Sequence, residues 1–177
     1  MRKIALNIII VILVSSCNAQ KTEQQHSVMK DSVIIQANRM MMSLNNKDYN
    51  SFIDKMYPKL VEKFGGKDKM LEGLNLAYEK LDKQGIKIDS VIFSNPRKII
   101  EVGAELQTTV IETLIMSIPQ GKMVKKSTLI VISPDKGLTW YFLDTAGSDL
   151  NMMKSGFPNL SDSLIIEKEE KPIVYNK

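Results

Sequence analysis

The spacing of apolar residues changes once along this chain, near residue 86, and that change constrains the fold more than any other feature. Before it, apolar side chains recur every three or four residues, which is typical of amphipathic helices. After it, segments rich in Ile, Val and Thr are separated by turn residues, which is typical of strands. Because the helices come first and the strands second, the sequence predicts an α+β fold.

The helical part predicts several amphipathic helices with recognisable ends. Asp31 and Asp48 are candidate N-caps of the first two, and Gly85 closes the last. The apolar residues of the first helix include three consecutive methionines at 40–42, which we interpret as core filling rather than as an adaptable binding surface. The expected helices cover 32–45, the segment after Asp48, the segment from Pro58 to Gly65, and 67–84.

The strand part predicts an antiparallel meander, because turns that contain both Pro and Gly join its long strands. Two strands exceed the usual length of about five or six residues, so we expect a strongly curved sheet with bulges, with Gly103 as a candidate bend. The expected strands cover 86–93, 98–102, 104–118, 122–133 and 138–144.

The first sixteen residues have the layout of a secretory signal: a basic start, a run from Ile4 to Val14 that is apolar except for Asn7, and then two serines. The run is too short for a membrane-spanning helix, which needs about 20 residues. The sequence Val14-Ser15-Ser16-Cys17 resembles the lipobox of bacterial lipoproteins. This resemblance implies cleavage before Cys17 and attachment of diacylglycerol to its thiol, so that acyl chains such as palmitate hold the protein in the lipid bilayer. Ordinary secretion with cleavage after Ala19 is the alternative.

Four regions follow from this interpretation: a signal peptide at 1–16, a lipidated Cys17 with a flexible polar tether to residue 30, a single domain at 31–166, and a charged tail at 167–177. We expect the cell envelope, with the periplasm as the compartment and the outer membrane rather than the inner one as the anchor. Removing 1–16 lowers the net charge from +4 to +2. Basic residues are almost all lysines without interleaved aromatics, which argues against nucleic acid as a partner.

The composition excludes several kinds of chemistry. One Cys and one His, His26, cannot form an internal disulfide or a zinc site, so neither a metal nor a cofactor is expected. A serine nucleophile would have no histidine to activate it within the domain. Phosphate-binding glycine motifs are also missing, because Gly65-Gly66-Lys67 lacks the spacing of a P-loop.

Four motifs resemble the nuclear transport factor 2-like (cystatin-like) superfamily over residues 31–146: Asp48-Tyr49, Tyr57-Pro58, Gly65-Gly66-Lys67, and the final segment from Trp140 to Asp144. The resemblance implies that the N-terminal helices pack on the curved sheet to form a cone, often with a ligand cavity inside. Members of this family include isomerases as well as non-catalytic binding domains, so the fold does not select a function.

The favoured interpretation is a non-catalytic domain that binds a small apolar ligand or an envelope protein, with Tyr57, Trp140 and Phe142 as candidate ligand-binding residues. The alternative is an isomerase-like acid–base enzyme with a buried carboxylate in the cone. Glu112 and Asp144 are its candidates, because Glu112 alternates in phase with Val110 and Asp144 with Phe142. The sequence leaves the oligomeric state open.

Overall fold

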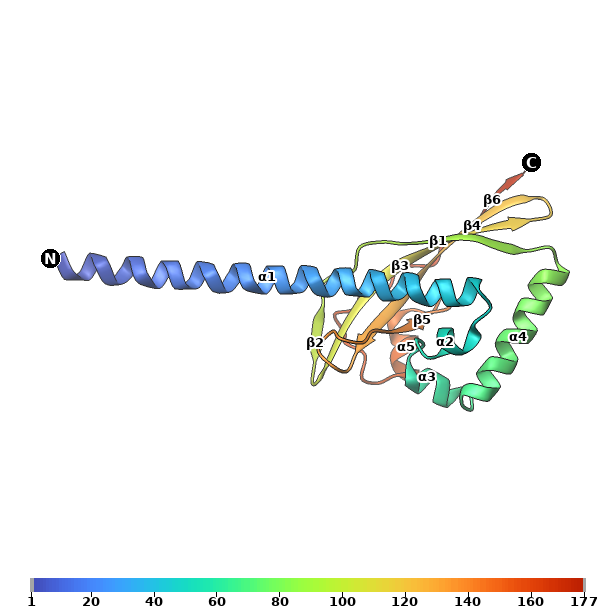
Figure 1. The fold of residues 1–177 in the computed structure, drawn as a ribbon, viewed down its shortest axis with the longest axis horizontal. Coiled ribbons are helices and arrows are strands. Elements are labelled where there is room, and N and C mark those ends of the chain that lie inside the picture. The colour runs from blue at the N-terminus through green and yellow to red at the C-terminus, as the bar shows by residue number, and fades with distance from the viewer. Residues whose placement is uncertain (1, 177) are drawn as a thin grey trace.

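The computed structural model describes the backbone of residues 2–176 and the side chains of residues 24–176 (Figure 1). It confirms an α+β fold in which helices accompany a six-stranded antiparallel sheet. The helices are α1 (Arg2–Asn45), α2 (Tyr49–Ile53), α3 (Pro58–Lys63), α4 (Lys67–Lys83) and α5 (Leu150–Gly156). The strands are β1 (Lys87–Phe93), β2 (Ile100–Val102), β3 (Glu105–Ile118), β4 (Gly121–Ser133), β5 (Tyr141–Asp144) and β6 (Ile173–Asn176).

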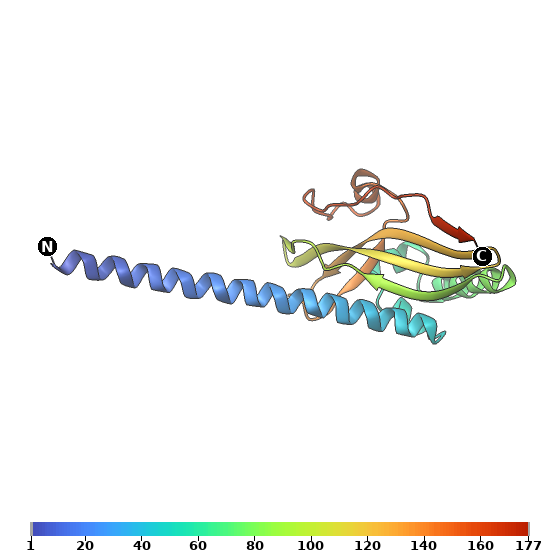
Figure 2. The same cartoon turned by 90° about the horizontal axis from the view of Figure 1, so that it is seen from above.

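Helix α1 differs most from expectation, because it does not begin near Asp31 but runs unbroken through the predicted tether (Figures 1 and 2). The segment contains no Gly or Pro, and its Gln, Lys, Glu and Met residues are good helix formers. Met29, which the sequence assigned to the tether, packs against the core. The division into signal, tether, domain and tail stays a prediction. The side chain of Cys17, with its predicted lipid, lies outside the described residues.

Helices α2, α3 and α4 begin and end close to where the local sequence predicts, whereas α5 lies in a segment in which no helix was expected. The carboxylate of Asp48 accepts a hydrogen bond from Ser51 N at 3.1 Å and so caps α2, as expected for an Asp at that position. Pro58 occupies the first turn of α3. Gly66 precedes α4 and has φ +98°, a backbone conformation that residues with a Cβ rarely adopt. Over the described residues, no helix is both long enough and apolar enough to span a membrane.

The sheet has the order β1-β3-β4-β5, with β2 also paired to β3 and β6 to β4. Strands β3 and β4 form the long central hairpin, whose register runs from Leu106 opposite Ser133 to Ile118 opposite Gly121. Strand β1 carries an irregularity between Ile88 and Ser90, in line with the expected bulges. Strand β6 falls within the predicted charged tail and was not expected, because its four residues give too short a pattern to separate from a loop.

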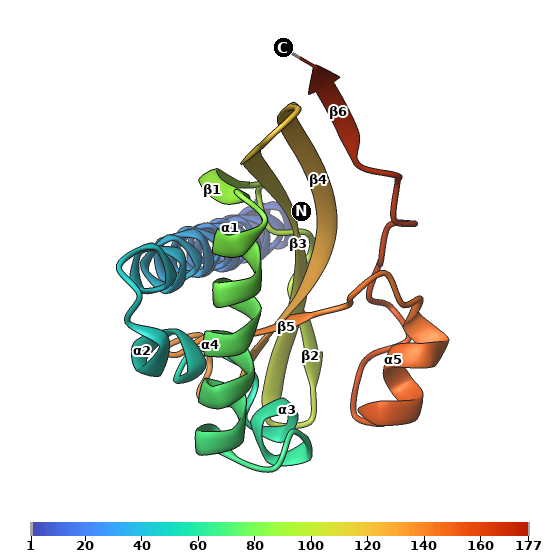
Figure 3. The same cartoon turned by 90° about the vertical axis from the view of Figure 1, so that its right-hand side faces the viewer.

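The sheet is covered differently on its two faces (Figure 3). The helical layer buries one apolar cluster, in which α1 contributes residues such as Val33 and Ala37 and the sheet contributes Val110, Leu129 and Phe142. The C-terminal part of the chain covers the other face and buries a second cluster. That cluster contains Ile130, Ile132, Leu143, Met153, Leu160 and Leu164.

Residues 157–169, here called the strap, are held to this second face by polar side chains of β3 and β4. The amide of Gln107 donates to the Asn159 carbonyl at 3.0 Å and accepts from the Ser161 N–H at 2.9 Å. Thr109 donates to the Ile165 carbonyl, and Thr128 accepts from the Glu167 N–H, both at 3.1 Å. The expected charged tail is therefore attached to the sheet where it begins.

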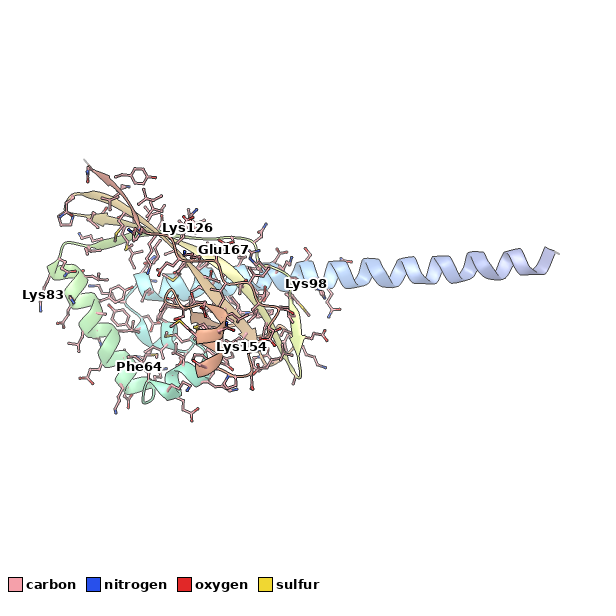
Figure 4. The ribbon with its side chains drawn as sticks, turned by 180° about the vertical axis from the view of Figure 1, so that it is seen from behind. Phe64, Lys83, Lys98, Lys126, Lys154 and Glu167 are labelled. Atoms are coloured by element: carbon pink, nitrogen blue, oxygen red, sulfur yellow. The ribbon has the colours of Figure 1, made fainter. Side chains whose placement is uncertain are left out.

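The end of the strap also closes a small pocket of about 70 Å³. Lys126 of β4 and Glu167 of the strap, both labelled in Figure 4, contribute to its lining. Glu167 pairs with Arg97, and Lys125 pairs with Glu169 at 2.9 Å. Because these charges are partly exposed to solvent, each pair adds little stability, and the hydrogen bonds from the side chains of Gln107, Thr109 and Thr128 to the backbone hold the strap in place.

Gly121 permits the close approach of β6 to β4, and its replacement tests that pairing. The residue has φ +151°, and an added Cβ would lie 2.0 Å from the carbonyl oxygen of Tyr175. We expect Gly121→Ala to detach β6 and to speed amide hydrogen exchange in a peptide covering 170–177. Gly156→Ala is the matched control, because its added methyl group would meet no other segment of the chain within 4 Å. Unchanged protection of β6 in Gly121→Ala would contradict the register.

Candidate functional site

Glu112 lies on the helix-covered face of the sheet. Its carboxyl group is buried there, and 8% of the residue is exposed. It lies on β3 between Phe93 of β1 and Ser127 of β4, which are its partners on the neighbouring strands. Ser127 Oγ donates a hydrogen bond to Glu112 Oε2 at 3.3 Å. Glu112 alternates in phase with the fully buried Val110, so the expected inward orientation is confirmed. Among the described side chains, no other carboxyl is buried.

This environment changes the chemistry of the Glu112 carboxyl. The pKa of Glu112 is raised from 4.5 to about 7. Burial is the largest cause of this rise, and the negative charge of Asp144 is the second. The hydrogen bond from Ser127 and the positive charge of Lys125 act in the opposite direction but are weaker. Near neutral pH, protonated and ionised Glu112 therefore coexist, and the group can donate or accept a proton.

On the helical side, Tyr78 lies close enough to this carboxyl to feel its charge. Tyr78 of α4 packs against Tyr49 of α2 with ring centroids 5.3 Å apart. Burial, followed by the neighbouring Tyr49 and the charge of Glu112, raises the pKa of Tyr78 to about 12. The Tyr78 hydroxyl therefore keeps its proton at physiological pH and can serve as a hydrogen-bond donor.

The cluster-facing residues of α4 are more exposed to solvent than those of α1. Five of the α1 side chains in the helix-side cluster are buried, whereas Leu71, Leu74 and Tyr78 of α4 are only partly buried against it. Val91 and Phe93 of β1, beside Glu112, are partly buried as well. Glu112 thus lies on the face of the sheet that this cluster covers, next to the partly buried Phe93 of β1.

A cleft of about 410 Å³ opens beside this cluster, between the end of α1, the second half of α4 and the start of β1. Tyr78 lines the cleft and also lies close enough to Glu112 to feel its charge. Glu112 itself does not line the cleft, so Tyr78 is the residue that the cleft shares with the surroundings of the carboxyl. The other apolar residues that line the cleft are Leu44, Leu81, Ile86 and Ile88.

The remaining sequence-predicted site residues do not gather at one place. Asp144 is exposed, and its Oδ1 accepts from the Ala146 N–H at 2.9 Å, but its charge reaches Glu112. Trp140 and Phe142 belong to the helix-side cluster, with 0% and 3% exposed. Tyr57 is buried in the second cluster across the sheet, against Phe157. The structure therefore brings Glu112 and Asp144 together but separates Tyr57 from Trp140 and Phe142.

Sequence reasoning missed Tyr78, Phe93 and Ser127 as neighbours of Glu112. Tyr78 fits the apolar stripe of its helix and resembles an ordinary core residue. Phe93 and Ser127 lie beside Glu112 only because of the register between the strands. A slip of one residue would replace them, and no local feature of the sequence fixes that register. Within the described side chains, no three His, Cys, Asp or Glu residues are grouped so that they could hold a metal ion.

No family model matches this chain. No curated protein and no solved structure matches it with significance either. The likeness of its motifs to the nuclear transport factor 2-like superfamily, and of its first seventeen residues to lipoprotein signals, therefore stays a prediction.

The charge of Asp144 gives the site a testable electrostatic partner. We expect Asp144→Asn to lower the pKa of Glu112, because it removes the nearby negative charge while its amide oxygen can still accept the Ala146 hydrogen bond. Lys125→Gln is the opposing variant and should raise the pKa, since Lys125 favours the ionised form. Carbon NMR titration of the Glu112 carboxyl measures both. Shifts in the same direction would contradict this arrangement.

Proposed function

We propose that this chain is a lipoprotein of the bacterial cell envelope, anchored through an acylated Cys17, whose domain binds a small apolar ligand without transforming it. The observation that carries the binding role is the buried carboxyl of Glu112 on the helix-covered face of the sheet, where the α4 side chains of the apolar layer are only partly buried. A protein core rarely retains a carboxyl group with one hydrogen bond of 3.3 Å unless the group serves a purpose. A ligand with a polar group would supply the missing partner.

The surrounding residues define the chemistry of this ligand. Leu71, Leu74 and Phe93 offer apolar contact area, which favours a hydrocarbon or aromatic body. Glu112 and the protonated Tyr78 offer a hydrogen-bond acceptor and donor at one end. The cleft beside Tyr78 provides the entrance. We also propose that helices and sheet form the cone of the nuclear transport factor 2-like superfamily, with this cluster as its interior.

Extraction of the purified chain tests the binding role. The full-length protein is isolated from envelopes in detergent, and small molecules that remain bound are identified by mass spectrometry. Leu74→Trp should displace the ligand, because residue 74 belongs to the inner face of α4. Leu76→Trp is the matched control, since residue 76 is 60% exposed on the same helix. No bound molecule, or equal amounts in both variants, would count against a binding domain; an envelope protein retained instead would favour the protein-binding alternative.

The anchor has its own test. Cys17→Ala should abolish incorporation of labelled fatty acid and move the protein from the detergent phase to the aqueous phase, because two or three acyl chains make membrane binding practically permanent. Substitution of His26 by Ala should change neither property. Unchanged partitioning of Cys17→Ala would overturn the proposed location and leave the binding role open to separate test.

A second candidate function, an isomerase-like acid–base enzyme, is favoured by one observation. The pKa of Glu112, about 7, lies where a general base works best near neutral pH, and Tyr78 keeps a proton to donate. If the chain is such an enzyme, Glu112→Gln should abolish proton exchange at a carbon of the bound ligand, while the ligand itself stays bound. Solvent deuterium incorporation into the extracted molecule distinguishes the two: incorporation that depends on Glu112 indicates catalysis.

A further inference from the structure

The outward face of α1 carries an apolar stripe that nothing in the described part of this chain covers. Val28, Ile35 and Met42 are 62%, 50% and 62% exposed, and they recur every seven residues, so they stand above one another on one side of the helix. Leu138, 79% exposed, lies next to the first two, across a groove of about 540 Å³. Figure 2 shows this helix at the edge of the molecule, with its N-terminal half clear of the other elements.

Two charges flank the centre of this stripe symmetrically. Asp31 precedes Ile35 by four residues and Arg39 follows it by four, and both are exposed beside the groove. In the described part of the chain, neither side chain forms an ion pair, although several other exposed charges do. The stripe itself is therefore apolar. A negative charge lies beside it on the N-terminal side of Ile35, and a positive charge lies beside it on the C-terminal side.

We propose that this face binds a second copy of the chain, with the two α1 helices antiparallel and a two-fold axis at Ile35. This register places Val28 opposite Met42 of the partner subunit and Ile35 opposite Ile35 of the partner subunit. Asp31 then faces Arg39 of the partner subunit, and the same pair forms again on the other side of the axis. The contact is self-complementary, as a two-fold interface requires.

The charges select this arrangement over the alternatives. A parallel pair in the same register would set Asp31 against Asp31 of the partner subunit and Arg39 against Arg39 of the partner subunit, which places like charges together. A lipid surface would accept the apolar stripe and Arg39, but it would desolvate Asp31 near the centre of the contact without giving it a partner. The antiparallel pair satisfies both charges.

Cysteine cross-linking in the full-length chain tests the register. Across a helix–helix contact, opposed residues come within disulfide reach, with Cα atoms about 6 Å apart. Ile35→Cys should therefore form a disulfide-linked dimer upon oxidation with copper–phenanthroline in isolated envelopes. Val28→Cys alone should lose this product, whereas Val28→Cys and Met42→Cys expressed together should regain it. The wild-type chain, which contains Cys17, measures the background.

Charge exchange tests the recognition independently. Asp31→Arg and Arg39→Asp should each abolish the Ile35→Cys cross-link, and the double exchange should restore it, while circular dichroism confirms that all three chains fold. Self-linking of Val28→Cys as strong as that of Ile35→Cys would indicate a parallel pair and overturn the proposal. Absence of any cross-link in folded Ile35→Cys, or quenching of a probe at residue 35 by brominated lipid, would overturn it as well.

Discussion

Replacing Glu112 by Gln is expected to raise the free energy of unfolding by about 3 kcal/mol near pH 8 and to leave it almost unchanged near pH 4. The folded chain holds the Glu112 proton up to about pH 7, whereas an unfolded glutamate releases it near 4.5. Wild-type stability therefore falls as the pH rises through this window and stays reduced above it. The amide introduced by Glu112→Gln carries no charge to bury, so the variant avoids this loss.

Chemical denaturation at a series of pH values measures the effect. Glu101→Gln is the matched control, because Glu101 is exposed on the neighbouring strand β2, and this change should alter stability little at any pH. Equal stabilisation at low and high pH would mean that Glu112 ionises as readily in the folded chain as in the unfolded one. The proposed site would then lack the buried acid on which it depends.

Trp140→Ala is expected to destabilise the chain more than any surface change, by about 3–5 kcal/mol. Trp140 is 0% exposed, and its backbone N–H donates to Gln36 Oε1 at 3.1 Å. Gln36 in turn donates to the Leu138 carbonyl at 3.0 Å, so this loop is bound to α1 at the point where the indole fills the core. Removing the ring leaves a cavity that these fixed neighbours cannot close.

Trp140→Phe separates the volume of the indole from its polar group. The Nε1–H is buried without a hydrogen-bond partner among the described residues, so its loss should offset part of the lost packing. We expect this variant to cost less than about 2 kcal/mol, as followed by circular dichroism during urea unfolding. If both variants were equally damaging, or both harmless, the indole would not fill the core as described. If Trp140 instead contacted a ligand, Trp140→Ala would weaken binding without unfolding the domain.

The sequence predicts much of the fold, because helix periodicity, caps and turns are local properties. Asp48, Pro58 and Gly66 mark helix ends through their own backbone and side-chain chemistry, and the structure uses each of them accordingly. The start of α1 was misplaced because Asp31 can cap a helix but also lie on the exposed side of a longer one. Five of the six strands were recognised, and β6 was missed.

The candidate site was predicted only in part, because a site depends on pairings between distant segments. The alternation of inward and outward residues along the strand was sufficient to predict that Glu112 points inward. It was not sufficient to place Tyr57, whose backbone N–H bonds to Phe142 while its ring passes to the opposite face of the sheet. Tyr78 lies close enough to feel the charge of Glu112 because of how α4 packs, which no spacing in the sequence encodes.

The strap has a consequence for how the chain matures. Gln107, Thr109 and Thr128 of the sheet bond to the strap, which is synthesised after them, and Ile130, Ile132 and Leu143 are not fully covered until the strap emerges. A chain still leaving the ribosome or the translocation channel therefore exposes part of an apolar surface, and this domain completes its folding only after residues 157–169 have emerged. Premature termination before residue 157 would leave a product prone to aggregation and degradation.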